Sequence, residues 1–151
     1  MKTLVFFILS IFFSVNVISQ NFDELPYNYL QKQVAFQVDK QEVKRNIPGG
    51  YTIVNDESTK LVCEKKLNNR IYEIQYFFEQ GNLTGVTFIQ HSSRIWKILE
   101  ELESLKFSVV DNITLNGIET TMFEKKPYKL GAIVIYNEEK RIVSCILSKT
   151  K

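Results

Sequence analysis

The sequence predicts an α+β fold: two tandem helix–four-strand units that form a mostly antiparallel sheet with the helices on one face. Three observations lead to this prediction. Stretches in which apolar and polar residues alternate recur between turn residues, which is typical of antiparallel strands. One other stretch has the spacing of an amphipathic helix. Finally, the order of elements over about residues 39–91 is repeated over residues 92–148.

The first nineteen residues have the layout of a secretory signal peptide. A short basic start containing Lys2 is followed by an apolar run over residues 4–13 and by small or branched residues up to Ser19. We expect cleavage after Ser19 or one residue later; a retained membrane anchor is the alternative, although the run is short for a span. The segment resembles export signals of Bacteroidetes-type bacteria. We therefore expect a secreted or periplasmic protein, with one domain over residues 20–151 and no membrane span after cleavage.

The charges of the chain argue against a nucleic-acid partner. Lys and Arg number 19 against 17 Asp and Glu, and the two signs are interspersed. A nucleic-acid-binding surface needs basic residues clustered on one face. No such cluster is evident in the sequence, so nucleic acid is not expected among the partners.

The start of the domain is ambiguous. Residues 21–28 read as an extended arm or loop, whereas residues 33–38 fit either a strand or a helix, with the strand favoured. The first clear helix begins at Asp39, which is followed three residues later by Glu42 in the pattern of a capping box. Pro48 and the two glycines after it end this helix.

The most distinct strand pair is a hairpin over residues 69–90. A tight turn is expected at Gly81-Asn82, because these residues adopt positive φ readily. Gly85, in the returning strand, indicates a bulge or a close packing contact. Simple alternation places Leu83 on the opposite face from Val86.

Further strands are predicted on both sides of this hairpin. They cover residues 51–54, 60–66, 107–110, 118–126, 130–137 and 141–148. Residues 55–58 are expected to form a turn, and residues 111–117 a loop. Two strands close on the same tripeptide, Glu64-Lys65-Lys66 and Glu124-Lys125-Lys126, at matching places in the two proposed units.

The strongest helix signal follows residue 91. Ser92 or Ser93 is expected to cap the helix, and Trp96 is expected to pack at the margin of the core. The apolar stripe of this helix consists of Ile95, Ile98, Leu99, Leu102 and Leu105.

This order of elements supports a resemblance. A short capped helix, a meander of strands, a tight turn and a tandem copy resemble the architecture of the β-lactamase-inhibitor-protein family, and a single copy resembles BamE-like lipoproteins of outer-membrane assembly. The resemblance covers the mature chain at the level of element order, and it carries over no functional residue. It implies a secreted or periplasmic protein that binds other proteins.

Residues suited to catalysis or metal binding are few. His91 is the single histidine, and its neighbours Ser92 and Ser93 do not form a nucleophile elbow. Cys63 and Cys145 are too few for a zinc site, and the sequence leaves open whether they form a disulfide. We therefore predict no enzyme activity, no metal and no cofactor.

Aromatic residues supply the remaining functional hint. They are enriched both in protein contacts and in cores, so each reading stays open. The candidate contact surface consists of Tyr72, Tyr76, Phe78, Phe88 and Tyr136. The sequence predicts a non-catalytic module that binds a protein or peptide of unknown identity through its sheet face. The alternative is a carrier that holds a small apolar ligand between sheet and helices. Residues 20–38 could also cover the sheet face.

Overall fold

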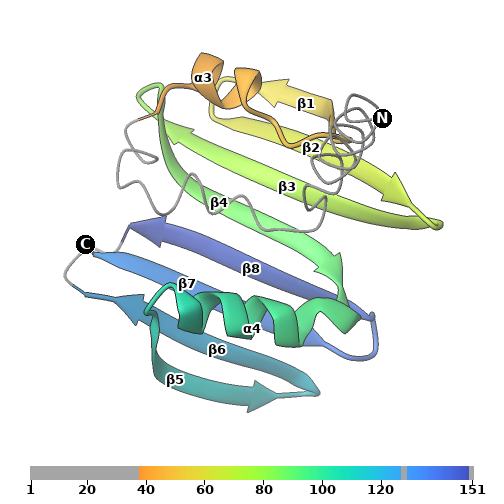
Figure 1. Cartoon of the computed structure of the whole chain (residues 1–151), viewed down its shortest axis with the longest axis vertical. Helices are drawn as coiled ribbons and strands as arrows, with labels where there is room; N and C mark the ends of the chain where they lie inside the picture. The colour runs from red at the N-terminus through yellow and green to blue at the C-terminus, as the bar shows by residue number, and fades with distance from the viewer. Residues whose placement is uncertain (1–37, 127–128, 150–151) are drawn as a thin grey trace, which may run out of the picture.

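Over the residues that the structure describes, the fold is an eight-stranded antiparallel sheet with two short α-helices. A computed structural model describes residues 38–126 and 129–149, and the strand order across the sheet is β1-β2-β3-β4-β8-β7-β6-β5 (Figure 1). The predictions for the signal peptide and for residues 20–37 lie outside the described residues. The strands are β1 (Thr52–Glu57), β2 (Lys60–Leu67), β3 (Arg70–Glu79), β4 (Asn82–His91), β5 (Ser108–Leu115), β6 (Ile118–Lys125), β7 (Leu130–Asn137) and β8 (Ile142–Lys149).

The antiparallel sheet that the sequence predicts is confirmed, but helices contribute less than an α+β prediction implies. Helix α3 (Lys40–Arg45) has six residues, the 3-10 turn η2 (Ser92–Arg94) has three, and α4 (Ile95–Ser104) has ten. Every pair of neighbouring strands is antiparallel, and β4 joins β8 at the centre of the sheet. The described fold is therefore mostly β.

Both edge strands are longer than predicted. Residues 55–58 were expected to be a turn and residues 111–117 a loop, yet β1 continues to Glu57 and β5 to Leu115. The reason is a one-residue bulge in each strand, at Val54 and at Val110, where the pairing register shifts. A bulge interrupts the alternation of apolar and polar residues, so a periodicity of two does not detect the strand beyond it.

The hairpin of β3 and β4 differs from its prediction in two details. The turn lies at Gln80-Gly81, both with positive φ, and Asn82 already pairs with Glu79. An extra residue, Thr84, then shifts the register of β4. Because of this bulge Leu83 lies on the same face as Val86, not on the opposite one as predicted.

The bulge and the close contact expected at Gly85 are both present. The register shifts beside this residue, and a Cβ atom there would lie 3.3 Å from the carbonyl oxygen of Leu147 in β8. Glycine therefore allows β4 and β8 to approach at the centre of the sheet.

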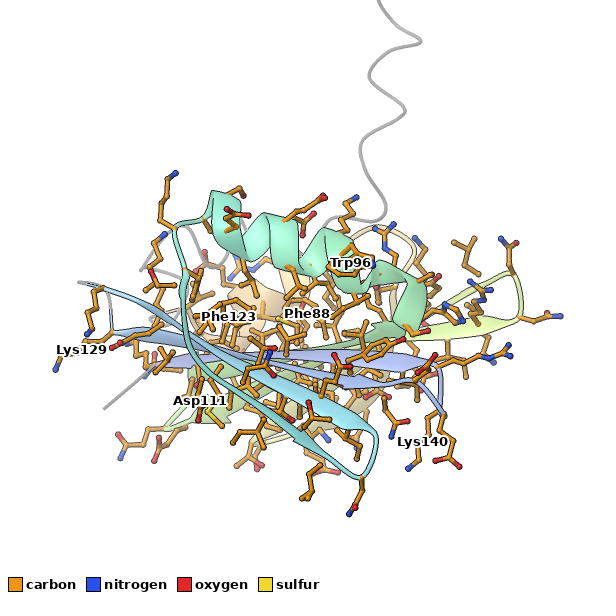
Figure 2. The ribbon with its side chains drawn as sticks, turned by 90° about the horizontal axis from the view of Figure 1, so that it is seen from below. Phe88, Trp96, Asp111, Phe123, Lys129 and Lys140 are labelled. Carbon is orange, nitrogen blue, oxygen red and sulfur yellow. The ribbon has the colours of Figure 1, made fainter. Side chains whose placement is uncertain are left out.

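One face of the sheet carries the core. Side chains of β2, β3, β4, β7 and β8 on this face are buried, and Phe88 and Phe123 lie between the sheet and α4 (Figure 2). From the helices, Val43 of α3 and Ile98 and Leu102 of α4 belong to the same cluster. The apolar stripe predicted for α4 is thus confirmed as its packing face.

The helix ends confirm one predicted cap and correct another. The carboxylate of Asp39 accepts a 2.8 Å hydrogen bond from the amide of Glu42, as the capping box predicts. Ser92 and Ser93 do not cap α4. His91 instead accepts a hydrogen bond from the amide of Ser93 and begins the 3-10 turn that leads into α4.

Trp96 does not lie at the margin of the core. Its side chain is 73% exposed on α4 (Figure 2), one residue outside the stripe that packs on the sheet. The direction of a side chain around the helix axis decides this placement. The buried stripe is centred on Ile98 and Leu102, and Trp96 points away from it.

Candidate functional site: the open sheet face

The five aromatic residues of the predicted contact surface all lie on the core face. Tyr76, Phe78 and Phe88 are at most 5% exposed, so they present almost no surface to a partner. Tyr72 and Tyr136 are half-buried, and their strand partners place them on this same face. For the three buried residues the contact prediction is therefore wrong and the core interpretation holds: α4 and α3 pack on the face that these residues occupy.

The opposite face of the sheet is a better candidate. Side chains alternate between the two faces of a strand, so the residues between the core positions point away from α4. Asp111, for example, lies on the side of the sheet remote from α4 (Figure 2). Among the described residues, both helices contribute their buried side chains to the core face, and neither packs on this open face.

Apolar residues gather on one half of the open face, over β4, β8, β7, β6 and β5. Strand pairing aligns them in rows: Thr87, Ile146, Ile133 and Met122 form one row, and Ile89, Ser144, Ile135, Thr120 and Ile113 form the next. We call this surface the apolar half; it consists of Ile89, Ile113, Leu115, Ile118, Met122, Ile133, Ile135, Ile142 and Ile146.

The central and peripheral members of the apolar half differ in exposure. Ile133 and Ile146 are direct cross-strand partners and are half-buried by their neighbours. Towards the edge exposure rises, and Ile113 and Leu115 of β5 are 47% and 67% exposed. A contiguous exposed apolar surface of this kind marks a contact site more often than isolated apolar residues do.

The other half of the open face, over β1, β2 and β3, is largely charged. On β2 and β3 its polar side chains are Lys60, Glu64, Lys66, Glu73 and Gln75, which surround Val62, Ile71 and Phe77. On β1 the same face carries Thr52, Asn55 and Glu57. The ammonium group of Lys60 lies 5.5 Å from the centre of the Phe77 ring, and Gln75 donates a hydrogen bond to Glu73. We call the five polar residues of β2 and β3 the polar half. Charged side chains such as these are usually exposed to water.

The sequence of β7 indicates the apolar half, although it does not alternate between apolar and polar residues. In β7 both sets of alternate residues are apolar: Ala132 and Val134 face the core, and Ile133 and Ile135 face outward. A strand that is apolar on both sides indicates a second contact surface. Tyr76, Phe78 and Phe88 fill the core because their side chains are large.

His91 lies at the end of β4, beside the open face. Its Nδ1 atom is 2.9 Å from the hydroxyl oxygen of Ser93 and accepts the Ser93 amide at 3.2 Å. These contacts cap the turn η2. The arrangement is that of a polar residue at a strand-to-helix junction.

The two cysteines lie in one row across the core face but are not neighbours. Cys63 of β2 and Cys145 of β8 are separated by Ile74 and Phe88 on the two strands between them. Three strand spacings put them about 14 Å apart, beyond the reach of a disulfide. Both thiols are free and buried. Burial raises the pKa of Cys63 to about 11 and that of Cys145 to about 12.

Charge is concentrated where α3 meets β1. Lys40 and Lys44 both form ion pairs with Asp56, and Lys40 also donates to the backbone carbonyl of Glu57. The hydrogen bonds from the two lysines hold the pKa of Asp56 below its ordinary value. This cluster ties the helix to the edge of the sheet, and a solvent-exposed pair of this kind stabilises a fold only weakly.

Two further features are absent from the part of the chain that the structure describes. No group of three or more His, Cys, Asp or Glu side chains in residues 38–126 and 129–149 is placed to hold a metal ion. Within the same ranges no helix has the length and apolar character needed to cross a membrane.

Comparisons with protein-family models, with curated proteins and with solved structures find no match for this chain. The resemblance in element order therefore stays a prediction.

Proposed function

We propose that this protein is a secreted or periplasmic, non-catalytic module that binds a protein or peptide through the apolar half of its open sheet face. The observation that carries the proposal is the contiguous set of branched apolar side chains on β4, β8, β7 and β6, on the face away from α4. Such a surface in water is costly unless a partner covers it for part of the time.

The composition of this surface favours a protein as the partner. Its apolar centre, around Ile133 and Ile146, is interleaved with the hydroxyl side chains of Thr87, Thr120 and Ser144. An apolar core with polar groups within and around it is the usual anatomy of a protein–protein interface. The adjoining polar half would then supply charges that select among partners without adding much affinity.

Export is part of the proposal and is supported by the first nineteen residues. Their basic start, apolar run and small-residue end are typical of a secretory signal. Mass spectrometry of the protein recovered from culture medium or periplasm checks it: an N-terminus at Gln20 or Asn21 is expected, and an intact Met1 in the cytoplasm would contradict it.

We also infer that the chain consists of two copies of one helix–four-strand unit. The strand order supports this, since β1 to β4 and β5 to β8 run inward from opposite edges. The bulges at Val54 and Val110 occupy equivalent places in β1 and β5. At the centre of the sheet Val86 of β4 pairs with Leu147 of β8, and Phe88 of β4 pairs with Cys145 of β8. Two equivalent strands pair in this symmetric way when a twofold axis runs between them close to Thr87.

The alternative function, a carrier of a small apolar ligand between sheet and helices, has weaker support. The aromatic rings of Phe88 and Phe123 occupy the space between α4 and the sheet (Figure 2). A carrier needs a cavity lined by such residues rather than filled by them. Organic-solvent extraction of the native protein checks this alternative: recovery of a stoichiometric lipid would favour the carrier.

Site-specific photo-crosslinking tests the proposed contact surface. A photoreactive amino acid is placed at Ile135 or Ile146 in the apolar half, and at Lys60 or Glu64 in the polar half as matched controls. We expect the apolar positions to give a discrete protein adduct in the exporting cell and the control positions to give little. Equal labelling from both halves, or no adduct at any position, would contradict the proposal.

A further inference from the structure

The two edges of the sheet are protected to different degrees. Strand β1 has six residues, and its Asp56 is held by two lysines of α3. Strand β5 is longer, with eight residues; like β1 it is exposed along its whole length and includes no Lys, Arg, Pro or Gly. Natural sheets use such residues to prevent pairing at an edge. Among the described residues, β6 is the only strand that pairs with β5, so its outer side is open.

The turn after β5 determines which backbone groups point outward. Asn116-Gly117 forms a two-residue turn with positive φ at both positions, so Leu115 and Ile118 are a hydrogen-bonded pair. Hydrogen-bonded and non-hydrogen-bonded pairs alternate along an antiparallel ladder. Asn112 and Thr114 consequently direct their N–H and C=O groups away from β6, and the amide of Asn112 donates a 2.8 Å hydrogen bond to the carboxylate of Asp111.

We propose that β5 is an assembly edge on which a second copy of this chain pairs in antiparallel orientation, with Ile113 opposite the partner copy's Ile113. This register places Asn112 opposite the partner copy's Thr114, and the reverse. The outward backbone groups of the two copies then pair, and each Asn112 amide exchanges the Asp111 carboxylate for the carbonyl oxygen of the partner copy's Thr114. The sheet of one molecule then continues into the sheet of the other.

The side chains of β5 suit this register. Asp111 is the single charged residue of the strand, and it falls opposite the partner copy's Leu115, so no carboxylate faces another. On the open face the exposed Ile113 gains an apolar contact. On the other face the side-chain amide of Asn112 lies opposite the hydroxyl group of the partner copy's Thr114. The bulge at Val110 limits the pairing to the end of the strand, which predicts a weak, concentration-dependent dimer.

Sedimentation velocity over a range of concentrations tests the proposal. Thr114→Pro removes an N–H that β6 does not use, and it places a ring where the partner strand would lie. Thr114→Ala keeps the N–H and is the matched control. We expect Thr114→Ala, which loses only the hydroxyl opposite Asn112, to raise the dissociation constant of the dimer less than about threefold, and Thr114→Pro to raise it at least about tenfold. A monomeric parent, or a proline variant that dimerises as the parent does, would overturn the proposal.

A charge pair tests the register independently of the proline variant. In the proposed dimer Ile113 faces itself, so Ile113→Lys alone and Ile113→Glu alone each place like charges opposite one another. Each variant should sediment as a monomer, and an equimolar mixture should form a heterodimer. The idea fails if the mixture stays monomeric, or if either variant alone associates as strongly as the parent.

Discussion

The distribution of single side chains on α4 shows how this small fold is stabilised. The side chain of Leu102 is fully buried between α4 and the sheet. Its neighbour Glu103 and the single tryptophan, Trp96, face solvent. A residue at the centre of the core contacts side chains from several strands, and its removal leaves a cavity. Exposed side chains on the same helix contribute little to the free energy of unfolding.

Truncation of Leu102 should therefore destabilise the protein strongly. We expect Leu102→Ala to lower the free energy of unfolding by about 2–5 kcal/mol, because it loses apolar burial and leaves a void. Glu103→Ala, one position along, is the control and should change it by less than about 0.5 kcal/mol. Chemical denaturation monitored by circular dichroism measures both. Similar effects of the two substitutions would show that α4 does not pack as described.

The buried cysteines give a second prediction at the residue scale. Burial raises the pKa of Cys63 to about 11 and of Cys145 to about 12. The thiolate is the reactive form, so neither residue should react with a thiol reagent in the native protein at pH 8. Both should react once the chain is unfolded.

The same shifts connect stability to pH. Because the folded pKa values lie above the ordinary value of about 9, the unfolded chain ionises first as pH rises. The thiol contribution to stability is present below pH 9 and is lost between about pH 9 and pH 12. Cys145→Val should reduce this alkaline loss, and an unchanged pH profile would contradict the burial of that thiol.

At the scale of elements, α3 depends on its first residue. The helix has six residues and is too short to be stable alone, so its cap and its contact through Val43 decide whether it forms. Asp39→Ala removes the hydrogen bond to the amide of Glu42. We expect a loss of about 1 kcal/mol in the free energy of unfolding, and Asp39→Asn, which keeps an acceptor, should retain most of it. Equal losses for the two variants would contradict the capping role.

Prediction from the sequence succeeded where one local rule decides the outcome. The cap at Asp39, the stripe of α4 and the strands from β2 to β4 follow from capping chemistry and periodicity. It failed at Val54 and Val110, where a bulge changes which face the following residues occupy. At Thr84 the neighbouring Gly85 indicated the bulge, but alternation still placed Leu83 on the wrong face. No glycine marks the bulges at Val54 and Val110, and alternation alone does not locate a bulge.

The same limit applies to the candidate site. Alternation correctly predicts that the candidate aromatic residues of β3 and β4 share one face of the sheet. It does not predict which face the helices cover. Tyr76 and Phe88 proved to be core because α4 and α3 pack on their side. The apolar half was indicated in the sequence by Ile133 and Ile135, which make β7 apolar on both faces.

For the whole molecule, the proposed two-unit organisation has a direct consequence. Each unit has roughly half of the residues of the domain, and units of that size hold only a marginal core. We expect the fragments 20–91 and 92–151 to be unfolded when expressed separately and to form a one-to-one folded complex when expressed together, joined through β4 and β8. Circular dichroism and size-exclusion chromatography measure this. Independent folding of either fragment, or failure of the pair to associate, would contradict the two-unit account.

Partner capture by matched surface variants tests the central claim, that the apolar half of the open face is a protein-binding surface. The baits are the exported protein, a variant with Ile133→Thr and Ile146→Thr in the apolar half, and a variant with Lys60→Thr and Glu64→Thr in the polar half. Threonine keeps the β-branched shape, so the fold should be retained, and thermal unfolding of each bait verifies it.

Quantitative mass spectrometry of the proteins captured from the envelope or medium decides the result. The account predicts one protein that the parent and the polar-half variant recover in similar amounts, and that the folded apolar-half variant recovers at least about tenfold less, because buried apolar anchors carry most of the binding energy of an interface. Equal recovery by all three folded baits, or no specific protein with any of them, would contradict the account.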